Sequence, residues 1–62
     1  MEEDGKERFI RVYSNLPMNV RKEIIIIIDN KPITWDVAYN EVMNNTKIGL
    51  IITEKLIKME II

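Results

Sequence analysis

Apolar residues recur at the spacing of one helical face early in the chain. They are Phe9, Val12, Tyr13 and Leu16. Positions i, i+3, i+4 and i+7 lie on the same side of an α-helix. We therefore expect a first helix that begins near Lys6 and is broken before Pro17, because proline disfavours helical geometry at the residue that precedes it.

The next apolar run predicts a second helix from about Pro17 to Ile28. In this helix Val20, Ile24, Ile27 and Ile28 share a side. The alternative is a buried strand at "IIIIID" that turns at "DNK" into "PIT", because runs of β-branched residues are favoured in sheets. Pro32 lacks a backbone donor, and an isolated two-stranded hairpin is marginal in water. We therefore favour the helix.

Two further helices follow, each preceded by a threonine that is a good N-cap. The first begins after Thr34, and its apolar face is Trp35, Ala38, Tyr39 and Val42. The asparagines at positions 44 and 45 end it. The second begins after Thr46 and runs to the C-terminus, with an apolar face formed by Ile48, Ile51, Ile52, Leu56 and Met59.

These elements predict an all-α fold, a small bundle of three or four short helices. The alternative fold is α+β, with a hairpin at residues 24–34. Residues 1–5 are polar and acidic, so we expect a flexible N-terminus, since free chain ends are usually poorly ordered. Residues 6–62 then form a single small helical domain.

Some apolar residues do not lie on the core side of these predicted helices. Successive helical residues are turned by about 100°, so five consecutive isoleucines surround a helix. Ile25 then lies on the flank of the second helix and Ile26 points nearly opposite to its apolar side. A strand with two apolar faces would also need cover on both. The predicted protein interface comprises Ile25 and Ile26 together with Leu50, Ile57 and Ile61, which fall outside the main stripe of the last helix.

The small size of the chain strengthens the expectation of a partner. A domain of 62 residues buries only about 60% of the surface of its unfolded chain. Small domains commonly add disulfides, metals or oligomerisation to a modest core. The sequence has no cysteine and no histidine, so disulfides and the usual zinc ligands are excluded. A protein partner or a homo-oligomer remains.

Charge and hydropathy disfavour nucleic acid and membranes as partners. The chain has 9 basic and 10 acidic residues, so it lacks the positive excess that gives affinity for nucleic acid. Direct nucleic-acid binding is therefore not expected. No apolar run reaches the roughly 20 residues that span a bilayer, and the acidic start "MEEDGKER" is unlike a signal peptide. We expect a cytoplasmic protein without membrane contact.

No pattern of catalytic residues is present. The carboxylates, lysines and hydroxyls are scattered and unpaired, so we expect no enzyme activity, no metal site and no cofactor. The segment "VAYNEVMNNTKIGLIITEKL" has the form of a helix-turn-helix, and a dimeric DNA-binding regulator is therefore the alternative function. The start of its second helix, "KIGLI", suits packing better than contacts to base edges.

The segment "LPMNVRKEIIIIIDNKPITWDVAYNEVMNN", about half the chain, resembles the small isoleucine-rich helical proteins of thermophilic archaea. Some of these are accessory subunits of larger replication enzymes such as family-B DNA polymerase. The resemblance carries over no functional residue. It implies a small bound subunit, and we predict a non-catalytic module that binds and stabilises a larger protein or self-associates through apolar surfaces.

Overall fold

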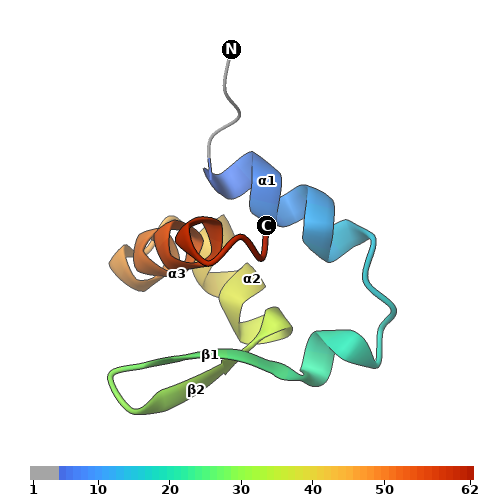
Figure 1. Cartoon of the computed structure of the whole chain (residues 1–62), viewed down its shortest axis with the longest axis horizontal. Helices are drawn as coiled ribbons and strands as arrows, with labels where there is room; N and C mark the ends of the chain where they lie inside the picture. The colour runs from blue at the N-terminus through green and yellow to red at the C-terminus, as the bar shows by residue number, and fades with distance from the viewer. Residues whose placement is uncertain (1–4) are drawn as a thin grey trace.

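Three α-helices and a two-stranded hairpin make up the computed structural model, which describes residues 5–62 (Figure 1). The elements in chain order are α1 (Gly5–Ser14), the short 3-10 turn η1 (Val20–Lys22), β1 (Ile24–Ile28), β2 (Lys31–Thr34), α2 (Trp35–Met43) and α3 (Lys47–Lys58). The prediction of an all-α bundle is wrong, and the α+β alternative with a hairpin at residues 24–34 is the observed fold. Of the predicted N-terminal tail, residues 1–4 lie outside the described residues and Gly5 begins α1.

The predicted second helix is replaced by η1 and a strand because residues 29 and 30 form a hairpin turn. Asp29 and Asn30 have φ angles of 50° and 66°, in the left-handed region that these residue types tolerate best after glycine. Two residues in this conformation are typical of a type I′ turn, whose twist matches that of paired strands. The turn sets β1 antiparallel to β2, with Ile26 opposite Ile33 and Ile28 opposite Lys31.

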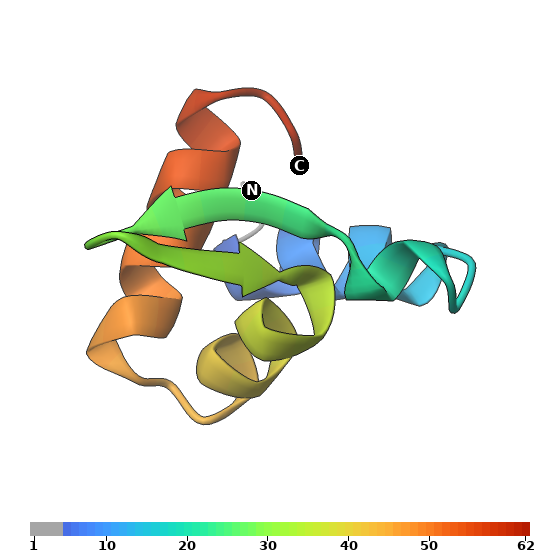
Figure 2. The same ribbon diagram turned by 90° about the horizontal axis from the view of Figure 1, so that it is seen from below.

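Tertiary packing overcomes the low stability of an isolated hairpin. Ile28 and Ile33 on its inner face are buried in the core, and Ile26 packs partly buried beside them. At the open end of the hairpin, the Trp35 N–H donates a hydrogen bond of 3.3 Å to the Glu23 carbonyl oxygen. Figure 2 shows the hairpin along one side of the molecule, with the helices behind it.

The core lies between the hairpin and the three α-helices. Its buried apolar members are Phe9, Ile28, Ile33, Trp35, Ala38, Val42, Ile52 and Leu56. Phe9 of α1 occupies the centre, where its ring lies 5.8 Å from the ring of Trp35 and 6.0 Å from that of Tyr13, measured between centroids. Burial of an aromatic side chain is among the largest single contributions to so small a core.

Both predicted N-caps are confirmed. The Thr34 hydroxyl accepts a hydrogen bond of 3.1 Å from the Val37 N–H, and the Thr46 hydroxyl accepts one of 2.9 Å from the Gly49 N–H. The prediction that the last helix runs to the C-terminus is wrong. It stops at Lys58 because Glu60 adopts a φ of 60° and the following residues form a Schellman motif that satisfies the last carbonyl groups.

An aromatic cluster joins η1 to α1 and α2. The rings of Tyr13 and Tyr39 stack with centroids 4.4 Å apart, and the guanidinium of Arg21 lies 4.3 Å from the centre of the Tyr13 ring. The Tyr13 hydroxyl donates a hydrogen bond of 2.7 Å to Asp36. This bond, more than desolvation, raises the pKa of Tyr13. The cluster therefore holds the segment that leads into β1 against the helices.

Candidate protein interface

The outer face of the hairpin exposes isoleucine side chains. Ile24 is 59% exposed and Ile27 is 65% exposed. The two residues are three positions apart, yet an irregularity in the pairing between Ile24 and Ile26 places them both away from the core. Pro32, exposed on β2, lies opposite Ile27. We call Ile24, Ile27 and Pro32 the hairpin face.

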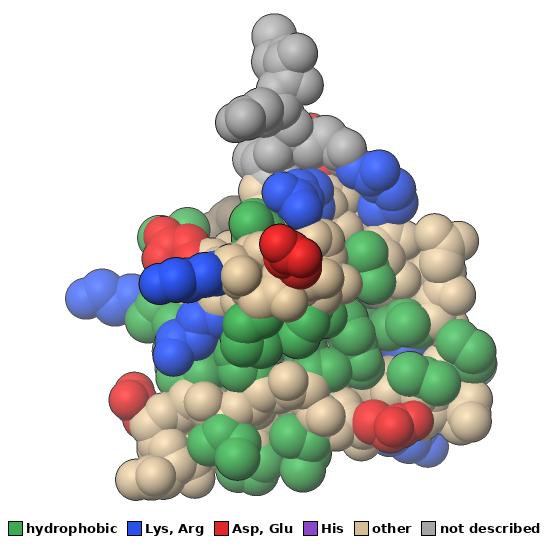
Figure 3. Space-filling model, viewed as in Figure 1, with side chains coloured by type: hydrophobic (Ala, Val, Ile, Leu, Met, Phe, Trp, Pro, Cys, Tyr) green, Lys and Arg blue, Asp and Glu red, His purple; other side chains and the backbone are tan. Residues whose placement is uncertain are grey.

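The hairpin face is apolar and lies on the side of the sheet that the helices do not cover. Figure 3 shows hydrophobic side chains along the hairpin at the lower edge of the molecule. The sheet has only two strands among the described residues, so no further strand extends or shields it. Single exposed apolar residues are common on soluble proteins, but neighbouring ones on one uncovered face are typical of a binding surface.

The predicted interface residues lie on two separate elements. Ile25 and Ile26 in β1 are partly buried and pack against the core. In α3 and the residues after it, Leu50 is 61% exposed, Ile61 is 39% exposed and Ile57 is partly buried. In the predicted helix Ile26 faces outward, whereas in a strand successive side chains point to opposite faces. An alternation of two residues would have placed Ile27 on the face opposite Ile26 and Ile28.

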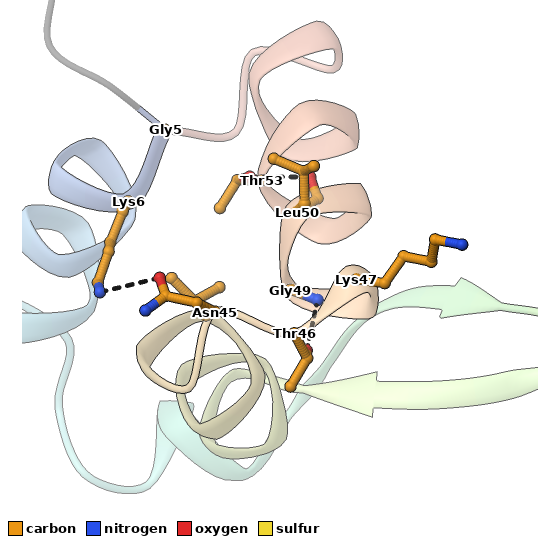
Figure 4. A pocket seen from close by; sticks show the side chains of 9 residues that line it. Gly5, Lys6, Asn45, Thr46, Lys47, Gly49, Leu50 and Thr53 are labelled. Atoms are coloured by element: carbon orange, nitrogen blue, oxygen red, sulfur yellow. Dashed lines mark hydrogen bonds between the residues drawn. The ribbon is translucent and has the colours of Figure 1, made fainter.

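Leu50 lines a hollow between the N-terminus of α1 and the start of α3. The hollow has a volume of about 390 Å³, and its polar lining includes Lys6, Asn45 and Thr46 (Figure 4). The Lys6 ammonium donates a hydrogen bond of 3.1 Å to the Asn45 side-chain oxygen. The Lys47 side chain points away from the hollow in Figure 4. These polar groups already bond to one another or face away, so the hollow offers little to recognise a charged small ligand.

Two other kinds of site, a metal site and a membrane-spanning helix, are not found within residues 5–62. No group of three or more acidic, histidine or cysteine side chains within residues 5–62 is placed to hold a metal ion. None of the helices in this part of the chain has the length and apolar character needed to cross a membrane. Comparison with protein-family models, curated proteins and solved structures yields no match. The candidate site is the hairpin face, because Ile24 and Ile27 are both exposed on β1.

Proposed function

We propose that this protein is a non-catalytic binding module, an accessory subunit that docks on a larger protein through the hairpin face. The observation that carries the proposal is the exposure of Ile24 and Ile27 side by side on the uncovered face of a two-stranded sheet. Full burial of an isoleucine side chain contributes about 1.5–3 kcal/mol. Two such residues at the centre of an interface are enough to make binding depend on them.

The module would act by mass action. A subunit that binds only the folded form of its partner stabilises that form by RT ln(1 + [L]/Kd), about 2.7 kcal/mol at a hundredfold excess over Kd. The resemblance to archaeal accessory proteins supports a large enzyme of DNA replication, such as a family-B polymerase, as the partner. We place this activity in the cytoplasm, where such an enzyme works.

Replacement of Ile27 by lysine is expected to abolish partner binding and leave the fold intact. The substitution puts a charge where apolar area is buried in the complex, and an unpaired buried charge is strongly unfavourable. In the free protein Ile27 is 65% exposed, and substitutions at the surface usually change stability by only about 0.5 kcal/mol. Tagged wild-type protein captures the partner from an extract of the source organism, and titration calorimetry with the purified partner then gives the affinity.

Met18→Lys is the matched control for this experiment. Met18 is 76% exposed and lies before η1, outside the hairpin face, so the same change of charge is expected to leave the affinity unchanged. Equal binding by wild type, Met18→Lys and Ile27→Lys would contradict the proposal. Sedimentation velocity of the same three proteins shows whether the hairpin face instead holds two copies of the chain together.

One observation favours the alternative function of a DNA-binding regulator. Helices α2 and α3 are joined by residues 44–46, the connection of a helix-turn-helix, and α3 exposes Lys47, Lys55 and Lys58. The same helix also exposes Leu50 and Glu54, which give no favourable contact to phosphate.

Salt dependence separates the two functions. Counterion release makes DNA affinity fall steeply with ionic strength, whereas an apolar interface responds little. We expect fluorescence anisotropy to show no submicromolar binding to duplex DNA at about 0.15 M salt, with only weak and salt-sensitive binding below it. Sequence-specific, submicromolar binding at that salt would establish the regulator instead.

A further inference from the structure

The two edges of the hairpin differ in how well they are protected against pairing with another strand. The edge of β2 carries Lys31 and Pro32, and charged residues and proline are common devices that prevent edge pairing. The edge of β1 consists of five isoleucines, with neither charge nor proline, and within residues 5–62 no other strand pairs with it. Five β-branched residues also have a high preference for extended structure. The edge of β1 therefore lacks the charge and the proline that protect β2.

The register of the hairpin identifies a main-chain group available on this edge. The Ile28 and Lys31 pair flanks the two-residue turn and is the hydrogen-bonded kind, since a tight turn is closed by this bond. In an antiparallel ladder the next pair, Ile27 with Pro32, is then the kind without hydrogen bonds. The N–H and C=O of Ile27 consequently point away from β2, toward the open edge of β1. They are placed to pair with another strand.

Acidic residues stand at both ends of β1. Glu23 precedes the strand and Asp29 follows it, both exposed, and neither carboxylate has a hydrogen bond or ion pair to the residues that the structure describes. Antiparallel pairing of two copies of β1 centred on Ile26 would set Glu23 of one copy opposite Asp29 of the other, at both ends. Like charges directly opposite each other destabilise a strand pair. A different strand with a basic residue at each end would instead place opposite charges beside Glu23 and Asp29.

We propose that the free edge of β1 receives an extended apolar segment of the partner protein, bracketed by basic residues, as a third strand of the sheet. The proposal rests on the function proposed above and names the element that docks. Main-chain hydrogen bonds to groups such as those of Ile27 hold the segment, and its side chains on the outer side extend the hairpin face. The basic residues at its ends lie beside Glu23 and Asp29.

Synthetic peptides test the proposal on the full-length protein. The probe is the capped peptide KVTVTVK, an alternating strand sequence with a lysine at each end. Titration followed by amide NMR is expected to shift the signals of Ile25 to Ile27. The capped peptide EVTVTVE should bind several-fold more weakly, because its end charges face Glu23 and Asp29. KVTVTVK with N-methyl groups on alternate residues should lose binding about tenfold or more, because these groups block main-chain pairing.

A pair of variants at Ile27 separates main-chain from side-chain recognition. Ile27→Pro removes the outward N–H and keeps an apolar side chain, and Pro32 shows that this pair of positions accommodates proline. Ile27→Thr keeps the N–H and the β-branched shape. We expect Ile27→Pro to lose binding of KVTVTVK about tenfold and Ile27→Thr to lose clearly less than Ile27→Pro, with both far-UV spectra native. If Ile27→Pro fails to fold, the N-methylated peptide tests main-chain pairing in its place.

The outcomes distinguish this proposal from the function on which it rests. Failure of KVTVTVK to bind, or equal binding of its N-methylated form, overturns strand addition. Loss of the natural partner in Ile27→Lys but not in Ile27→Pro also overturns it and leaves the proposed function standing. A wild-type protein that dimerises with its Ile25 to Ile27 amides protected from exchange would show that a second copy is the occupant, contrary to the proposal.

Discussion

Replacement of Phe9 by alanine is expected to leave the protein largely unfolded at ordinary temperature. Phe9 is fully buried at the centre of the core, with its ring against those of Tyr13 and Trp35. Truncation of a buried phenylalanine costs about 3–5 kcal/mol, because transfer energy is lost and a cavity remains. The core of a domain this size rarely supplies more than about 3–5 kcal/mol in total. One substitution therefore removes most of the net stability.

Urea denaturation followed by far-UV circular dichroism measures this effect. Met18→Ala is the control, since Met18 is 76% exposed and its truncation removes little buried area. Phe9→Leu keeps much of the apolar volume and is expected to fall between the two. A denaturation midpoint for Phe9→Ala within experimental error of wild type would show that α1 does not pack on the core as described.

Replacement of Gly49 by alanine is expected to destabilise the protein by about 1–3 kcal/mol or more, the usual cost of inserting a methyl group where none fits. A Cβ atom at this position would overlap the Glu41 carbonyl oxygen and would lie 2.7 Å from the Glu41 carbonyl carbon and 2.9 Å from the Val42 nitrogen. These are backbone atoms at the end of α2, and the Thr46 N–H donates a hydrogen bond of 3.2 Å to the same carbonyl oxygen. The helices cannot separate without breaking this connection.

Whether Gly49→Ala raises or lowers the stability of the protein tests the contact between α2 and α3. In an isolated helix, glycine to alanine is stabilising by about 1 kcal/mol, so only the contact with α2 makes the substitution unfavourable. Gly5→Ala is the matched control, since the nearest atoms to its Cβ, at 3.0 Å and beyond, belong to the side chains of Thr53 and Ile57 and none is a backbone atom. Calorimetric melting of the two variants gives the comparison. Higher stability of Gly49→Ala would contradict the close approach of α2 and α3.

The helices that local signals specify were predictable from the sequence. Helices α2 and α3 each begin after a threonine whose hydroxyl accepts a backbone hydrogen bond within the first turn, and each has an apolar stripe of helical period. Helix α1 follows from the spacing of Phe9, Val12 and Tyr13 in the same way. A cap and a stripe depend on residues a few positions apart, so the sequence alone is sufficient to determine them.

The structure of Ile24 to Ile28 was decided by tertiary packing. Five identical β-branched residues carry no period, so neither a helical nor a strand face is marked in them. The core covers Ile28 and Ile33 on one side, and the left-handed turn at Asp29 and Asn30 brings the second strand back. These contacts join residues distant in the chain, such as Phe9 and Leu56, to the hairpin. They stabilise the strand over the helix, together with the turn.

The residues that form the candidate interface depend on whether Ile24 to Ile28 are a strand or a helix. An apolar surplus in so small a chain was evident from the sequence, because five isoleucines cannot all face one core. The identity of the exposed residues was not, since a helix turns Ile26 outward whereas the strand turns Ile24 and Ile27 outward. Composition thus determined that an apolar surface exists, and the pairing of β1 with β2, supported by the helices behind it, decided which side chains form it.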